Sequence, residues 1–271
     1  MGNNSIVMTE FILLGFPMSH QMSVFSFLLL LVIYALSLLG NLLIVIAVIV
    51  VEIDHCLHTS MFFFFFNLSL LEIVFPASLI PVMLVNLLSH TKAISFSTCI
   101  IQCFFYFFLG VAEFILLAVM SFECYVAICN PLRYSSIMNS KVCIQLMSVS
   151  WMGGFIIMSG PVMAISRLPF CGSNVNNHFF CDIEPLLSLS CTHSQLIELV
   201  DFVIAIVVLL DSLTLTTVSY TFIISTILKI PSASGRCKAF CTSTILILCV
   251  PQFPSVLKQY FGGGNWLCDF C

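Results

Sequence analysis

The sequence predicts an all-α membrane protein whose chain crosses the bilayer several times. Hydrophobic residues make up 61% of the 271 residues and charged residues only 7%, and the mean hydropathy is +1.17. Soluble domains carry about 25% charged residues, so a soluble fold could not bury this much apolar surface. The chain also contains several long apolar runs, and about 20 such residues in a helix cross the ~30 Å hydrocarbon core of a bilayer.

Six apolar segments are long enough to be membrane spans. They cover residues 23–51, 57–88, 99–120, 142–165, 196–228 and 239–257. Pro76 and Pro81 are expected to kink the second span, and Pro251 and Pro254 interrupt the sixth. Residues 258–271 are too short and too polar to cross, so the sequence indicates no seventh span.

The basic residues indicate which ends of the spans face the cytoplasm. Five of the eight lie after the third or the fifth span, and the tail before the first span has none. The N-terminus is therefore expected outside the cell, where Asn3 in the acceptor motif Asn3-Asn4-Ser5 can be glycosylated. The small net charge of −4 and the lack of a basic patch give no sign of nucleic-acid binding.

One stretch of the chain carries a longer and more specific motif than any other. It reads Met120-Ser-Phe-Glu-Cys-Tyr-Val-Ala-Ile-Cys-Asn-Pro-Leu-Arg-Tyr134 and follows the third apolar run. It resembles the signature Met-Ala-Tyr-Asp-Arg-Tyr-Val-Ala-Ile-Cys-x-Pro-Leu-x-Tyr of the olfactory receptor family of rhodopsin-like G-protein-coupled receptors. Where that family carries Asp-Arg-Tyr, this chain carries Glu123-Cys124-Tyr125, so the acid is kept and the arginine is replaced.

The resemblance extends over about residues 5–240. Gly40-Asn41, Leu57-His-Thr-Ser-Met-Phe-Phe-Phe64 and Ser219-Tyr220 are similar to family motifs in the first, second and fifth spans. After Lys238-Ala-Phe240 the family pattern is no longer recognisable. We therefore divide the chain into a receptor-like bundle over residues 1–240, a divergent sixth span over 239–257 and a divergent tail over 258–271.

The resemblance implies a ligand site between the outer halves of the helices. Five residues at three- and four-residue spacing share one face of the third span, and two in the fifth span are expected to lie opposite. These candidate ligand residues are Tyr106, Phe107, Gly110, Val111, Phe114, Ile204 and Val208. An all-apolar lining favours small volatile ligands. For each residue, ordinary helix packing is an equally good interpretation.

The resemblance also implies a G-protein switch at Glu123, Cys124 and Tyr125. In this receptor class the arginine at that place pairs with acids in the inactive state and packs against the G protein in the active state. A thiol carries no charge and cannot replace a planar cation with five donors. Glu123 has a simpler alternative, since it could be a solvated acid at a helix end.

Four cysteines are expected at the outer edge, where the compartment is oxidising. Spacing alone leaves three pairings open. The resemblance implies that Cys99 is bonded to Cys181 and Cys171 to Cys191. A metal site that used these cysteines with His178 or His193 fits no zinc spacing, and neither a metal nor a cofactor is expected.

Three acids lie inside apolar segments, which is costly unless each faces the bundle or water. They are Glu72, Glu113 and Asp211. The resemblance places Glu72 where the receptor class has an acid that helps to coordinate a sodium ion. A protonated carboxyl bonded to a neighbour is the alternative for all three.

The function implied by the resemblance is the detection of small volatile odorants at the plasma membrane, with a heterotrimeric G protein as partner. The first alternative is a non-signalling, truncated receptor product retained in the endoplasmic reticulum. The second is a transporter or channel, although no internal repeat of the kind common in transporters is visible. No catalytic pattern is found, so an enzyme is not expected.

Overall fold

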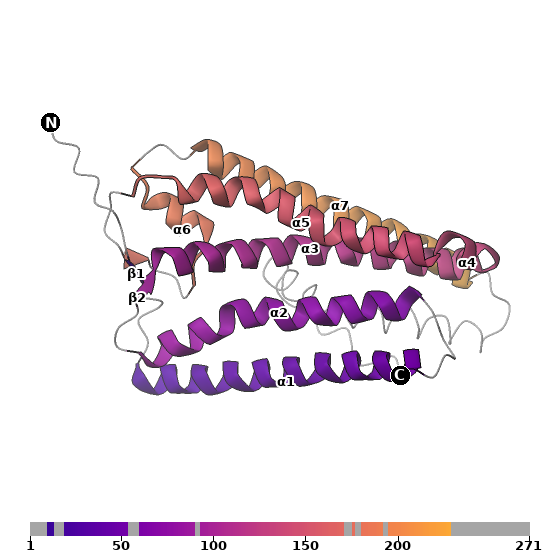
Figure 1. Ribbon diagram of the computed structural model, residues 1–271, viewed down its shortest axis with the longest axis horizontal. Coiled ribbons are helices and arrows are strands. Elements are labelled where there is room, and N and C mark those ends of the chain that lie inside the picture. The colour runs from indigo at the N-terminus through magenta and orange to yellow at the C-terminus, as the bar shows by residue number, and fades with distance from the viewer. Residues whose placement is uncertain are drawn as a thin grey trace.

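The computed structural model describes residues 10–13, 19–53, 60–89, 93–170, 175–176, 180–191 and 195–228. Its long helices lie side by side, and they are α1 (His20–Ile53), α2 (Ser60–Leu88), α3 (Phe96–Cys129), α5 (Ser140–Ser166) and α7 (Gln195–Leu228). The short elements are η1 (Pro131–Arg133), α4 (Tyr134–Ile137), α6 (Ile183–Ser188), β1 (Glu10–Leu13), β2 (Ala93–Ser95) and β3 (Val175–Asn176). Figure 1 shows β1 and β2 at one end of the bundle and α4 at the other. We call these the outer and the inner end.

Among the described residues, four helices are long and apolar enough to cross a membrane. They cover residues 20–50 of α1 and all of α2, α3 and α5. The fifth expected segment is one continuous helix, α7, which is not among these four. Its role as a span therefore stays a prediction. The sixth span and the tail lie outside the described residues.

The third apolar segment lies within a longer helix. Residue 120 is not the end of α3, which continues to Cys129 and so contains most of the family-like motif. No Gly or Pro interrupts residues 120–129. The helix ends where Pro131 disfavours helical geometry for the residue before it. Glu123, Cys124 and Tyr125 are consequently fixed on a helix and not in a loop.

Helix α2 contains both of its prolines and remains assigned as one helix. Figure 1 shows it changing direction along its length, as expected where a proline removes a backbone donor. Beyond Pro76, the Ser78 hydroxyl donates to the Phe75 carbonyl at 2.7 Å, and the Gln102 amide of α3 donates to the Ser78 carbonyl at 3.3 Å. These bonds tie the bent part of α2 to itself and to α3.

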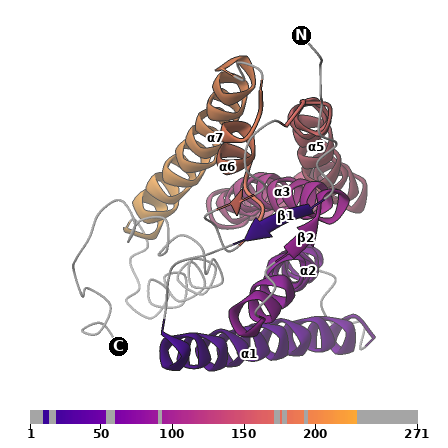
Figure 2. The same ribbon diagram turned by 90° about the vertical axis from the view of Figure 1, so that its left-hand side faces the viewer.

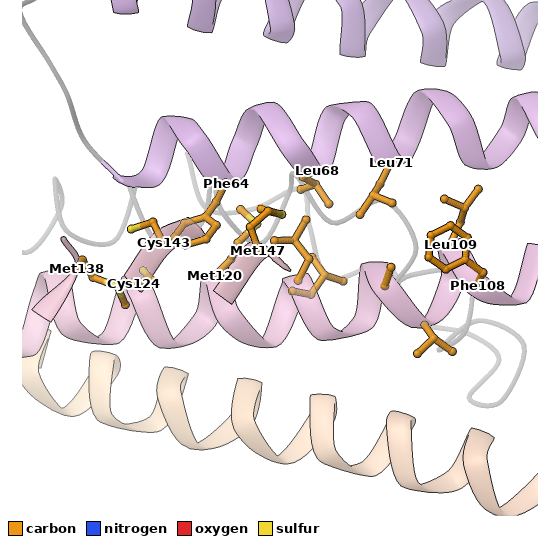
Figure 3. Packing of buried hydrophobic residues seen from close by; sticks show 14 of the residues in the cluster. Phe64, Leu68, Leu71, Phe108, Leu109, Met120, Cys124, Met138, Cys143 and Met147 are labelled. Atoms are coloured by element: carbon orange, nitrogen blue, oxygen red, sulfur yellow. The ribbon is translucent and has the colours of Figure 1, made fainter. Parts of the chain in front are cut away.

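Helix α3 is the centre of the described bundle, since it packs against α2, α5 and α7, while α1 packs mainly on α2. Its side chains supply most of a buried apolar cluster that also includes Phe64 of α2 and Met147 of α5 (Figure 3). The contact with α5 is very close. A Cβ atom added at Gly154 would lie 2.7 Å from the Phe108 carbonyl oxygen and 2.9 Å from the Ala112 nitrogen. Glycine is therefore required for these two helices to approach.

The outer end carries a three-stranded sheet in the order β2-β1-β3. The central strand β1 comes from the N-terminal tail, β2 leads directly into α3, and β3 lies between α5 and α7 in the chain. Figure 2, which looks onto this end, shows β1 and β2 lying across the end of α3. A second buried cluster lies beneath the sheet.

Candidate functional site

The expected ligand residues of α3 lie in the outer half of the helix, except Phe114, which lies just past its middle. Tyr106 is half-buried, and its ring packs against Phe75 of α2 at 5.4 Å, Phe107 at 4.9 Å and Phe180 at 5.4 Å between ring centroids. Phe75 also approaches Gly110, since a Cβ atom there would lie 3.7 Å from its ring. Phe75 and Phe180 were not singled out from the sequence, because only the fold brings them to this face.

The remaining expected ligand residues divide into two groups. Val111 is buried within the central cluster, so packing accounts for it. Phe114 of α3, with Ile204 and Val208 of α7, is half-buried, and the two α7 residues pack against the edge of that cluster. The structure thus brings the α7 pair to the same cluster as α3. An apolar groove of about 550 Å³ lies elsewhere, between α1 and α2, and includes none of these residues.

Hydrogen bonds fix α7 against α3 over much of its length. The Ser212 hydroxyl donates to the Phe114 carbonyl at 3.3 Å, and the Ser121 hydroxyl donates to the Thr216 hydroxyl at 3.3 Å. Near the inner end, the Cys129 thiol and the Thr226 hydroxyl are 3.2 Å apart. Each bond satisfies a polar group in an otherwise apolar helix interface.

At the inner end, Glu123 is not a solvated acid. It is only 2% exposed and accepts a hydrogen bond from the Tyr134 hydroxyl of α4. Burial raises the pKa of Tyr134 well above its usual range, and the bond to the Glu123 carboxylate raises it further. Tyr134 is a site residue that the sequence reasoning missed, because it lies eleven positions from Glu123 in a different element.

Cys124 is as deeply buried as its neighbour. It is 3% exposed and belongs to the central apolar cluster, with Phe64, Met120, Met138 and Cys143 in the same part of it (Figure 3). Its thiol is not in a disulfide. A small apolar side chain fits here without an electrostatic partner, whereas a cation would require one.

Tyr125 points to another neighbour. Its ring lies 5.7 Å from that of Phe222 on α7, in an edge-to-face arrangement, and 6.4 Å from that of Phe122. The three expected switch residues therefore contact different elements. Glu123 is bonded to α4, Cys124 faces the central cluster and Tyr125 packs on α7.

The outer disulfide is confirmed. Cys99 at the start of α3 is bonded to Cys181, with the Cα atoms 5.4 Å apart, and both residues are fully buried. Cys191 is also disulfide-bonded. Its expected partner, Cys171, lies outside the described residues, as does the glycosylation candidate Asn3, so both of those expectations stay predictions.

The three acids within the apolar segments have different surroundings. Glu113 is buried, and it interacts electrostatically with Glu72 of α2. Glu72 is hydrogen-bonded to Asn41 of α1, while its Oε1 atom is buried with no hydrogen-bond partner in the part of the chain that is described. Asp211 differs from both, because it is exposed on α7. Glu72 and Glu113 therefore face the bundle, as one of the two expected surroundings, whereas Asp211 lies on the outer surface of α7.

This architecture defines a multi-pass membrane helix bundle of the rhodopsin-like class. Comparison with known proteins makes the assignment specific. A family model described as "Olfactory receptor" matches residues 30–261. That match continues past Phe240, and so includes the segment that we set apart as divergent.

The chain is similar to curated olfactory receptors over most of its length. It is 50% identical to human olfactory receptor 6J1 over 254 residues, which are 92% of this chain and 72% of that receptor. It is 48% identical to mouse olfactory receptor 6E1 over 263 residues, 97% of this chain and 83% of that receptor. The chain therefore belongs to the olfactory receptor family, and its function is that of an odorant-detecting G-protein-coupled receptor.

Proposed function

We propose that this receptor binds a small, weakly polar odorant between the outer halves of α3 and α7. Tyr106, Phe107, Gly110 and Phe114 supply one wall, and the α7 pair Ile204 and Val208 the other. The half-buried state of most of these side chains supports the proposal, because a fully packed residue has no surface left for a ligand. Val111 contributes by holding the wall in place, since it is buried in the core.

Two isoleucines of α7 form a matched pair to test this site. Ile204 is half-buried against the central cluster, whereas Ile206 is exposed on the same helix. An odorant that binds only the folded receptor raises its unfolding temperature. In the purified receptor, Ile204→Trp should abolish the odorant-induced rise and Ile206→Trp should preserve it. Equal rises in both variants would place the ligand elsewhere.

We propose further that coupling to the G protein is weak, and the buried position of Cys124 carries this proposal. The family has an arginine there, and neither charge nor multiple donors can come from a thiol. In the described structure, Glu123 is instead bonded to Tyr134. The acid that would pair with the arginine is thus occupied by a neutral partner.

This second proposal has a direct test in cells. The receptor should respond to a bound odorant with cyclic-nucleotide signalling close to background, while a family member with the arginine responds strongly in parallel. Strong odorant-dependent signalling by this chain would contradict the proposal.

We place the receptor in the plasma membrane with its N-terminus outside. The charge distribution of the loops supports this orientation. Retention in the endoplasmic reticulum is the alternative, and it would also abolish signalling. Labelling of intact cells with a membrane-impermeant, amine-reactive reagent separates weak coupling from retention, because only a receptor at the surface reacts. Signalling is therefore to be normalised to the labelled fraction.

A further inference from the structure

We propose that residues 10–13 of the N-terminal tail form a plug that closes the outer end of the bundle, with Phe11 as the residue that holds it shut. The outer sheet and the buried cluster beneath it belong to neither the ligand site nor the G-protein site. The inference rests on the proposed orientation, with the N-terminus outside.

The first observation is the position of β1 at the centre of the sheet. It pairs antiparallel with β2, with Phe11 opposite Ile94, and parallel with β3, with Ile12 opposite Val175. A central strand satisfies its backbone groups on both sides. The tail thereby joins the segment that enters α3 to the segment between α5 and α7.

The second observation is the alternation of burial along β1. Phe11 and Leu13 are 0% and 1% exposed, while Glu10 is exposed and Ile12 half-buried. Successive strand residues point to opposite faces. One face of the strand is therefore inserted into the protein, as a plug requires, and the other faces outward.

The third observation is the set of rings around Phe11. Its centroid lies 5.9 Å from that of Phe96 at the start of α3 and 5.8 Å from that of Phe170 after α5, and the latter two are 5.5 Å apart. Edge-to-face and tilted pairs at these separations are favourable. Three separate parts of the chain thus meet at the Phe11 ring.

The plug covers a column of residues that leads to the ligand site. Cys99, Cys103 and Tyr106 follow one another at four- and three-residue spacing on α3 and so share one face. Cys99 and Cys103 belong to the same cluster as Phe11. Phe180, which is adjacent to the disulfide-bonded Cys181, packs on Tyr106 at 5.4 Å. The plug therefore seals the cluster and steadies the segment that reaches the proposed ligand wall.

The free thiol of Cys103 provides the readout. It is fully buried and not disulfide-bonded. In intact cells, a membrane-impermeant maleimide should label it slowly, and Phe11→Ala should raise its labelling rate at least tenfold. Ile12→Ala, on the opposite face of the same strand, is the matched control and should leave the rate unchanged. Cys103→Ser gives the background from other thiols.

Equal labelling rates for Phe11→Ala and Ile12→Ala would overturn the proposal. If Phe11→Ala labels only after the cells are permeabilised, while the unsubstituted receptor and Ile12→Ala stay protected, the plug is supported and the proposed orientation is wrong. The two failures are therefore distinguishable.

A second variant covers the case in which Phe11→Ala does not reach the surface. Glu10 and Ser95 are exposed register partners on β1 and β2. In a chain with Glu10→Cys and Ser95→Cys, a disulfide should form in nearly every surface receptor, since docking holds the two positions together. A surface receptor in which both introduced thiols stay free would show that the strand is not docked there, and would overturn the proposal.

Discussion

The two ends of α3 each carry buried residues but are held by different means. At the outer end, Cys99 is bonded covalently to Cys181 and lies beneath a sheet. At the inner end, Glu123 is held by a hydrogen bond from Tyr134, and Cys124 packs in the central apolar cluster. The outer end has the disulfide that the family resemblance implies, whereas the inner end lacks the family's arginine, since Cys124 stands in its place.

This difference separates folding from signalling. A thiol in the central cluster satisfies the packing requirement at position 124. The bundle therefore forms around Cys124 without the arginine. We predict that loss of the arginine affects signalling at the inner end and has little effect on whether the receptor folds.

Removal of the outer disulfide should have the largest effect on the fold. The bond joins residues 82 positions apart, and loss of a native disulfide typically costs about 2–5 kcal/mol. Cys99→Ser should therefore greatly reduce the amount of receptor at the surface, as measured by impermeant labelling. Cys103→Ser, one turn further along α3 and free of any disulfide, is the control and should retain most of it.

The contact between α3 and α5 should be the next most sensitive. Gly154→Ala places a methyl group within 3 Å of α3 backbone atoms, and such overpacking costs about 1–3 kcal/mol. Gly160→Ala on the same helix meets nothing within 4 Å. The first variant should unfold at a clearly lower temperature than the second in detergent. Equal unfolding temperatures would mean that the helices are not this close.

The inner end should be less sensitive. Tyr134→Phe leaves the Glu123 carboxyl buried without its donor, and hydrogen bonds to charged groups contribute about 1.5–3 kcal/mol. We expect a moderate fall in unfolding temperature, and no further fall when Glu123→Gln is added. Tyr125→Phe is the control, because its ring contacts with Phe122 and Phe222 do not require the hydroxyl. Additive effects of the two substitutions would show that Glu123 and Tyr134 are not coupled.

Glycosylation at Asn3 should have the smallest effect on stability. Glycosidase treatment should increase gel mobility, Asn3→Gln should abolish that change, and the unfolding temperature should stay the same. A membrane-inserted receptor whose mobility does not respond to glycosidase would contradict both the site and the outward orientation of the tail.

The sequence predicted the long helices well because their apolar runs are continuous. It failed where a polar residue is buried by a distant partner. Glu123 could be interpreted from the sequence as a solvated acid at a helix end, whereas the fold buries it against Tyr134. The pairing of Cys99 with Cys181 came from the family resemblance, as spacing alone left other pairings open.

The outer sheet could not be predicted from local pattern. Glu10-Phe-Ile-Leu13 is too short to show strand alternation, and its burial depends on pairing with β2 and β3. The importance of Gly154 could not be predicted either, because it depends on the α3 backbone that Gly154 faces. Both features arise only when distant segments meet.

A chimera tests the central claim most directly. Residues 120–134 of this chain should replace the matching segment of an arginine-containing family member that responds to a known odorant, and signalling should be measured per surface receptor. We predict that the chimera reaches the surface in normal amounts but signals near background, and that Cys124→Arg within it restores the response. Full signalling by the chimera without the arginine would contradict the account.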